Sequence, residues 1–413
     1  MIKVFIFCRR IFSLLLILAL TSCDSDKEAD PVSPTPTPTI PLPKITKVDP
    51  VTGMSGDIIT ITGEGLTAPN TKVYFSNKWF QLKPDREAEI LENKADVIKV
   101  RVPSEPFARD LAIYVKRDEI ASNNEKFVFV SKYWKPLVSK VFGTVSFAIN
   151  EIGYFISSSE VYSFNTVTNQ SKQMKNFPKG IFPATAFTWN NKGFIVLNTS
   201  PGEIWEYDNE QDSWSLKTTS NFINNLADAF SFVIENRVYI GGGQPNSNGN
   251  DVFAYDLVNN TWSQISDYPG IQGNGVSTIV VNGIGYCFGG GIYFSSIGGP
   301  PVRNGKWKYD PQLDKWIKLT ECPDSNWQAD RSFAPILSRD DKIYWGVGSS
   351  SNSGIEMNYM YEYSIPSNSW KLHSLIPYEY ASPGLWFTGF QASGKGYFKE
   401  VGSLGVWIFD PTK

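Results

Sequence analysis

The most regular pattern in the chain is a pair of aromatic residues, two positions apart, that recurs six times after residue 150. Side chains two positions apart lie on one face of a β-strand, so each pair predicts a strand with one packed face. A small polar residue follows each pair, and in four copies a tryptophan stands seven residues after the second aromatic. The pairs are Tyr162 and Phe164, Trp205 and Tyr207, Phe253 and Tyr255, Trp307 and Tyr309, Tyr361 and Tyr363, and Trp407 and Phe409.

Each copy also has an apolar strand, a tight polar turn and a strand with a central aromatic residue ahead of the pair. The unit is therefore a four-stranded antiparallel meander, which predicts one blade of a β-propeller. The last copy ends near Phe409, before its tryptophan strand can form. We expect residues 131–140 to supply the missing strand, because closing the ring removes exposed sheet edges. The sequence predicts six blades over residues 131–413.

A separate domain is predicted over residues 44–130. Thr60 and Thr62 alternate there with Ile59 and Ile61, which is the period of a strand. Short strands with this spacing predict a β-sandwich, and no helix of useful length is predicted. Further alternating stretches lie at 72–75, 97–102, 111–115 and 126–130.

Both regions resemble known families. Over residues 44–130, the proline and glycine frame ahead of Ile61 and Gly63 resembles the IPT/TIG family of immunoglobulin-like domains, which serve as spacers, dimerisation modules or carbohydrate binders. The stretches VYIGGG with AYDLVNNTW, and GYCFGGG with KYDPQLDKW, resemble the Kelch repeat. The resemblances imply an all-β chain: an immunoglobulin-like β-sandwich followed by a six-bladed Kelch-like β-propeller.

The N-terminus has the pattern of a signal peptide. Residues 1–22 carry basic residues and then an apolar run of about ten residues, too short to span a bilayer of roughly 30 Å. Leu-Thr-Ser before Cys23 resembles the bacterial lipobox, which implies that Cys23 is lipidated and that this lipid anchors the mature protein to a membrane.

Residues 23–43 are rich in proline and predict an extended tether. The acidic cluster after Cys23 resembles the surface-export signal of Bacteroidota lipoproteins, which implies an outer-membrane protein facing the cell exterior. In another bacterial group, aspartate beside the lipidated cysteine implies retention at the inner membrane, and the sequence does not name its host.

The net charge limits the expected partners, and the positions of the cysteines limit the expected disulfides. The net charge is −3 at pH 7 and no basic block is present, so we expect no nucleic-acid partner. Of the four cysteines, Cys8 lies in the signal peptide and Cys23 is the anchor. Cys287 and Cys322 are expected on non-adjacent strands of one blade and therefore unpaired.

Catalysis has to be weighed, since Kelch propellers include galactose oxidase and sialic-acid epimerases. Copper chemistry needs imidazole ligands, and the single histidine, His373, is expected to be a solvated or half-buried side chain on a repeat strand. We therefore expect no cofactor. An enzyme of the epimerase or lyase type stays an alternative, because carboxylates and arginines such as Glu356, Asp330 and Arg331 could serve it.

Loop lengths favour binding. In such a blade the second connection and the link to the next blade open on one face, and the second connections are long in blades three, four and five. Their aromatic, arginine and aspartate side chains suit stacking on sugar rings or a protein hot spot. We expect non-catalytic binding of a glycan, with an envelope protein as the alternative partner. The candidate ligand-binding residues are Tyr293, Phe294, Arg303, Trp327, Asp330, Arg331, Tyr378 and Tyr380.

Overall fold

The computed structural model describes residues 41–76, 85–94, 96–104, 110–138, 141, 143–180, 183–224, 226–243, 250–270, 275–290, 305–322, 332–348, 359–376, 387–400 and 405–413. Within these ranges the chain is all-β, and the single helical element is a 3₁₀ turn, η1 (Asn221–Ile223). None of the described segments forms a helix long and apolar enough to cross a membrane. The predicted signal peptide and Cys23 lie outside the described residues.

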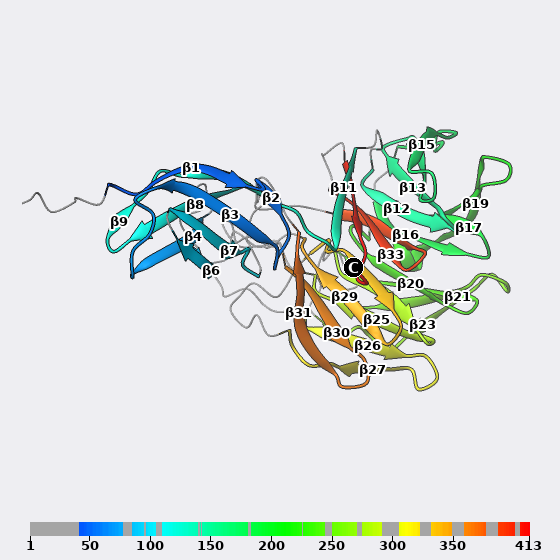
Figure 1. Cartoon of the computed structure of the whole chain (residues 1–413). Coiled ribbons are helices and arrows are strands. Elements are labelled where there is room, and N and C mark those ends of the chain that lie inside the picture. The colour runs from blue at the N-terminus through cyan, green and yellow to red at the C-terminus, as the bar shows by residue number, and fades with distance from the viewer. Residues whose placement is uncertain are drawn as a thin grey trace, which may run out of the picture. The chain divides into compact units, whose positions relative to one another are not determined.

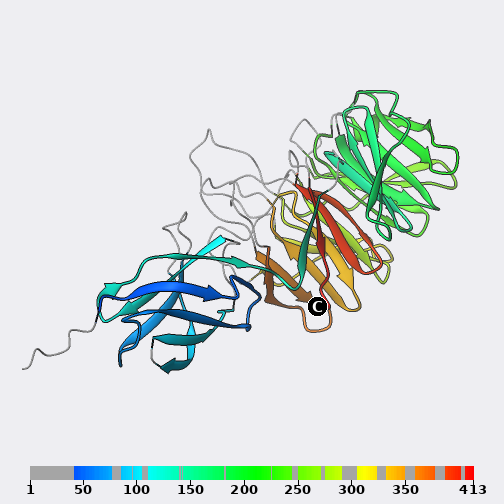
Figure 2. The same ribbon diagram turned by 45° about the horizontal axis from the view of Figure 1, so that its top comes forward.

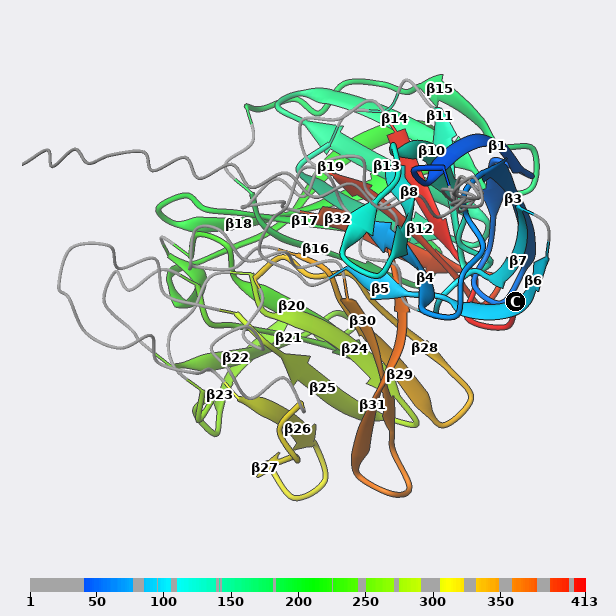
Figure 3. The same cartoon turned by 60° about the vertical axis from the view of Figure 1, so that its left-hand side comes forward.

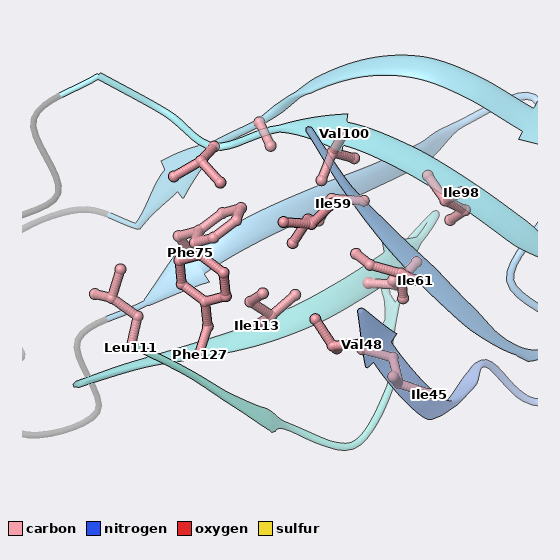
Figure 4. Close-up of a cluster of buried hydrophobic side chains, with 14 of the residues drawn as sticks. Ile45, Val48, Ile59, Ile61, Phe75, Ile98, Val100, Leu111, Ile113 and Phe127 are labelled. Atoms are coloured by element: carbon pink, nitrogen blue, oxygen red, sulfur yellow. The ribbon is translucent and has the colours of Figure 1, made fainter. Parts of the chain in front are cut away.

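The first domain is a sandwich of two sheets. One sheet has the order β1 (Lys44–Asp49), β3 (Ile58–Glu64), β7 (Val97–Arg101) and β6 (Glu89–Lys94). The other has the order β2 (Thr52–Gly53), β10 (Glu125–Phe129), β8 (Asp110–Arg117), β4 (Thr71–Ser76) and β5 (Arg86–Glu87), with β9 (Ile120–Ala121) paired to β8. The inward side chains of both sheets form one buried core (Figure 4).

The alternation seen in the sequence corresponds to the buried faces of this sandwich. Ile59 and Ile61 of β3 are fully buried, and Phe75 of β4 meets Phe127 of β10 edge-on with ring centroids 5.3 Å apart (Figure 4). The sequence did not predict the two edge strands β1 and β6 of the first sheet, nor the two-residue strands β2, β5 and β9. β1 buries Ile45 and Val48, three positions apart, with a register shift between Ile45 and Lys47, and β6 buries no side chain fully. Neither edge strand therefore has a clear alternation to detect.

Six four-stranded antiparallel sheets follow within the described residues and form the blades (Figures 1 and 3). In each blade the first strand is innermost. Blade one contains β12 (Val145–Ile149), β13 (Ile152–Ser157), β14 (Glu160–Asn165) and β15 (Gln170–Gln173), and blade two contains β16 (Pro183–Trp189), β17 (Lys192–Leu197), β18 (Gly202–Asp208) and β19 (Ser213–Ser220). Blade three contains β20 (Phe230–Ile234), β21 (Arg237–Gly241), β22 (Val252–Asp256) and β23 (Thr261–Ile265), and blade four contains β24 (Ser277–Val281), β25 (Ile284–Phe288), β26 (Lys306–Asp310) and β27 (Lys315–Lys318). Blade five contains β28 (Ile336–Arg339), β29 (Lys342–Gly346), β30 (Tyr359–Ser364) and β31 (Ser369–Leu375), and blade six contains β32 (Phe387–Ala392), β33 (Lys395–Glu400), β34 (Gly405–Phe409) and β11 (Trp134–Val138).

The ring is closed by a strand from the other end of the propeller. β11 pairs antiparallel with β34, with Trp134 opposite Phe409 and Val138 opposite Gly405, and the two strands lie side by side in Figures 1 and 2. Trp134 is 2% exposed, and its indole N–H donates to Ser374 Oγ of β31 at 3.1 Å. One residue therefore joins the closing strand both to its own blade and to blade five.

In blades two, four and five the repeated tyrosine and tryptophan connect the blade to the one before it. In blade four the Tyr309 hydroxyl donates to Asp314 Oδ1 at 2.8 Å, and the same oxygen accepts from the Ser266 backbone N–H of blade three at 3.0 Å. The Trp316 indole N–H donates to the Ser266 carbonyl at 2.9 Å. Blades two and five repeat this set with Tyr207, Asp212, Trp214 and Lys175, and with Tyr363, Asn368, Trp370 and Thr320.

Blade three departs from the set. Tyr255 still donates to Asn260, but the buried indole nitrogen of Trp262 has no hydrogen-bond partner in the part of the chain that the structure describes. The preceding link there contains the 3₁₀ turn η1, and Trp262 packs beside Phe222 of that turn with centroids 6.1 Å apart. The two cysteines of the propeller, Cys287 and Cys322, are buried and are not joined by a disulfide, as the sequence predicted.

Candidate functional site

The inner strands of all six blades begin around one cavity of about 210 Å³. Its walls are mostly small, hydroxyl-bearing and apolar side chains, with three phenylalanines and one carboxylate beside them. The lining includes Ser146, Thr185, Asp228, Gly275, Ser277, Phe333, Ala334, Phe387, Thr388, Gly389 and Phe398.

The strand register shows that the cavity opens on the face that carries the long second connections. Ser277, in the cavity wall, pairs with Phe288, the last residue of β25 before the long connection of blade four. Phe230 pairs in the same way with Gly241 in blade three, and Ile336 with Trp345 in blade five. The face predicted from blade topology is therefore the face of the cavity.

Among the described residues, side-chain hydrogen bonds join each inner strand, or a residue just before it, to the neighbouring inner strands. Most hydroxyl groups of the cavity wall, those of Ser146, Thr185, Ser277 and Thr388, have partners in the protein. The bonds run from Ser146 Oγ to the Gly389 carbonyl (2.9 Å), Thr188 Oγ1 to Ala148 (2.7 Å), Ser231 Oγ to Ala186 (3.4 Å), Thr278 Oγ1 to Ser231 (2.6 Å), Ser277 Oγ to Ala334 (2.8 Å), and Gln391 Nε2 to Ser338 (2.7 Å).

Asp228 is the exception to this satisfied wall. It precedes β20, has a left-handed backbone (φ 56°), and accepts a bond from the Gly275 N–H at its main-chain oxygen, 3.3 Å away. Burial raises the pKa of its carboxyl group. Within the described part of the chain no hydrogen bond or ion pair reaches this carboxylate, and no other lining residue is ionisable. Among the described residues the cavity thus carries one half-buried acceptor without a side-chain partner.

Phe333 contributes an aromatic ring in an unusual conformation. Its φ of 53° lies in the left-handed region, which is costly for a bulky side chain. Two backbone bonds hold it there: its N–H donates to the Gly275 carbonyl at 2.8 Å, and its carbonyl accepts from the Phe387 N–H at 3.2 Å. Gly275 is required beside it, because a Cβ at Gly275 would lie 2.6 Å from the Phe333 nitrogen and 2.8 Å from its ring. The half-buried ring is therefore fixed at the cavity wall.

The residues predicted as ligand contacts cannot be compared with this cavity directly. All eight, namely Tyr293, Phe294, Arg303, Trp327, Asp330, Arg331, Tyr378 and Tyr380, lie outside the described residues. Sequence reasoning did not identify Asp228 or Phe333, the two residues whose geometry distinguishes the cavity.

His373 is a half-buried side chain on β31, as the sequence predicted. Its ring packs between Tyr133 and Tyr344, with centroids 4.4 and 5.0 Å away, and burial lowers its pKa. No group of three or more histidine, cysteine, aspartate or glutamate side chains is arranged to hold a metal ion within the described ranges.

Comparisons with known proteins address the architecture. Residues 43–129 match the family model of the IPT/TIG domain, and residues 196–383 match that of the KLHDC2/KLHL20/DRC7 Kelch-repeats domain. No curated protein sequence matches the chain significantly.

Solved structures align with most of this chain at low sequence identity. One is a structural genomics protein of unknown function from Bacteroides thetaiotaomicron VPI-5482, with 10% identity, coverage of 91% of this chain and 99% of that chain, and a TM-score of 0.46. Another is an auxiliary nutrient binding protein from the same organism, with 12% identity, coverage of 89% and 97%, and a TM-score of 0.46. A third, YjhT, has 13% identity, coverage of 66% and 94%, and a TM-score of 0.50.

At sequence identities this low, a structural similarity concerns the fold alone. The strand topology and the two family matches agree on that fold: an immunoglobulin-like β-sandwich of the IPT/TIG type, followed by a six-bladed β-propeller of the Kelch type.

Proposed function

We propose that the propeller binds a glycan without converting it, and that the central cavity is the binding site. The observation that carries this proposal is the combination, in one cavity, of the Phe333 ring in a left-handed conformation and the Asp228 carboxylate without a protein partner among the described residues. Strained backbone and unsatisfied polar groups concentrate where a protein contacts a ligand.

The two residues have complementary roles toward a sugar. An aromatic ring offers an apolar face on which the C–H face of a pyranose can stack. An ionised carboxylate accepts several hydrogen bonds, and those from ligand hydroxyl groups would be charge-assisted. The cavity of about 210 Å³ is smaller than the roughly 300 Å³ at which pockets for drug-sized ligands begin, so we expect it to hold one sugar ring.

The same wall favours binding over catalysis. Enzymes that cleave glycosidic bonds mostly use two carboxyl groups, and general acid–base chemistry needs a proton donor and a proton acceptor. Among the described lining residues Asp228 is the one ionisable side chain. Hydroxyl groups such as those of Ser146 and Ser277 are already bonded within the ring of strands.

We also propose that the chain is a lipoprotein of the outer membrane that faces the cell exterior. The support comes from the sequence: the apolar run of residues 1–22, the lipobox-like residues before Cys23, and the acidic, proline-rich stretch that follows. A lipid anchor and a tether would hold the propeller near glycans outside the cell.

A glycan array probed with the full chain tests the binding proposal, and variants then test the site. Phe333→Ala should weaken binding of the recognised sugar about tenfold or more, as loss of a stacking residue does. Phe222→Ala is the matched control, because that ring is 46% exposed and packs on Phe253 outside the cavity. Absence of sugar binding, or a loss confined to the control variant, would contradict the proposal.

A further inference from the structure

The central cavity carries a negative charge that the described residues around it leave uncompensated. Asp228 is the one ionisable group in the described wall, which is otherwise apolar or hydroxyl-bearing. A buried cation lies on β33 beside the wall, where Lys399 pairs across the sheet with Thr388. Lys399 does not line the cavity, and its ammonium donates to the Glu400 carbonyl at 3.0 Å.

A charge in this position discriminates between ligands by their own charge. A half-buried carboxylate interacts with a second charge through a medium of lower dielectric than water, so attraction and repulsion are both stronger than at the surface. A ligand with hydroxyl, amide or ammonium donors would satisfy the carboxylate. A ligand carboxylate confined in the same 210 Å³ would be repelled by it and would leave it without a donor.

We infer that the cavity accepts neutral or amino sugars and rejects acidic sugars such as uronic acids, and that Asp228 determines this choice. The inference rests on the proposed function, since it concerns the ligand of the same cavity. It assigns Asp228 a specificity role, in addition to its role as a hydrogen-bond acceptor.

The raised pKa of Asp228 supports this assignment and provides a second measurement, the pH dependence of the preference for neutral sugars. Burial already disfavours the ionised form, so a nearby ligand carboxylate would raise the pKa further. Asp228 is the one titratable group among the described lining residues, so its protonation should remove most of the repulsion. Glu400 of β33, opposite Phe387 of the wall, is a second acid beside the cavity, and burial raises its pKa as well. The preference for neutral sugars should therefore shrink as the pH falls through the pKa of Asp228.

Sugar pairs that differ only at C6 provide the test. The methyl glycosides of glucose, galactose and mannose are titrated calorimetrically into the full chain at pH 7, each beside the matching methyl uronide. The neutral member of the recognised pair should bind at least tenfold more tightly. Asp228→Asn keeps the size and removes the charge, so the ratio should fall to about twofold or less. Glu210→Gln, on an exposed turn of blade two, should leave the ratio unchanged.

The outcomes separate the inference from the proposed function. If a uronide binds as tightly as its neutral partner, or if Asp228→Asn leaves a tenfold preference intact, the inference is overturned while glycan binding stands. If none of the six glycosides binds, the proposed function fails as well. Should Asp228→Asn not fold, Asp228→Ser and the pH dependence of the wild-type ratio replace it, and a ratio that stays constant as the pH falls would overturn the inference.

Discussion

At the scale of single residues, the buried charge of Asp228 lowers the stability of the folded state, while the residue lies in the proposed binding site. A half-buried carboxylate without a donor destabilises the folded state relative to a neutral side chain of the same shape. Binding sites commonly keep such residues, because function needs the unsatisfied group. Stability and binding should therefore respond to its substitution in opposite directions.

We expect Asp228→Asn to raise the melting temperature at pH 7 while it weakens sugar binding. The folded pKa of Asp228 is raised, so its contribution to stability is complete below the unfolded pKa of about 3.9 and is lost as the pH rises through the folded pKa. The gain from the Asn variant should therefore disappear on acidification. Thermal melts of both proteins between pH 3.5 and 7 measure this, and a lower melting temperature of the variant at pH 7 would be the contrary result.

The repeated tryptophans allow a matched comparison. Trp316→Phe removes the indole bond to the Ser266 carbonyl, whereas Trp262→Phe removes an indole N–H that has no partner. Both changes shrink a packed ring, so the difference between them isolates the hydrogen bond, which should make Trp316→Phe the more destabilising by about 1 kcal/mol. Urea unfolding of the two variants measures the difference. Equal losses would show that the indole bond does not stabilise the contact between blades.

Residues that play the same structural role in several blades could be recognised in the sequence, whereas residues with a role at one position could not. Tyr309 and Trp316 stand out because the same bonds between blades are made several times over. Asp228 and Phe333 occur in links between blades, which share no pattern. Nothing local in the sequence indicates the left-handed backbone of Phe333 or the meeting of six strand ends in one cavity.

At the scale of elements, aromatic periodicity predicted the blades because each strand buries one face against a neighbouring blade. The closing strand β11 was predictable since the last repeat lacks its fourth strand, and β11 pairs with β34. The edge strands β1 and β6 of the sandwich escaped prediction, because β1 buries Ile45 and Val48 at an irregular spacing and the side chains of β6 are at most partly buried. The hydrophobic pattern thus located strands with regular alternation and missed these two edge strands and three two-residue strands.

The contact between blade five and the closing strand contains the single histidine of the chain. His373 packs beside Tyr133, Tyr344 and Phe409, and its buried Nδ1 has no hydrogen-bond partner among the described residues. Burial lowers its pKa most; among its charged neighbours, Glu362 opposes this effect, while Lys371 and Lys342 add to it. Protonation should therefore weaken the contact at which the ring closes.

We expect the free energy of unfolding of the wild type to fall more steeply than that of His373→Phe between pH 7.5 and pH 5. A base whose folded pKa is lowered contributes stability above its unfolded pKa, about 6.5, and loses it as the pH falls through the folded pKa. Denaturant titrations at the two pH values give the comparison. Parallel losses in both proteins would mean that His373 is not the titrating group.

At the scale of the whole molecule, the proposed function requires the propeller to be held at a membrane. Cys23→Ala should abolish labelling of the chain with radioactive palmitate and release it from the membrane fraction, because no other anchor is predicted. Cys8→Ala, within the predicted signal peptide, is the matched control and should leave both properties unchanged. Retention of the Cys23 variant in outer membranes after a high-salt wash would contradict lipid anchoring.

The most direct test of the central claim is the location of the bound sugar. Crystals of the protein grown with the methyl glycoside that binds most tightly should show electron density for one sugar ring in the central cavity. We expect that ring to stack on Phe333 and to place a hydroxyl group within hydrogen-bond distance of the Asp228 carboxylate. Density for the sugar on the sandwich domain or on the outer strands of a blade, with the cavity free of it, would contradict the proposed site.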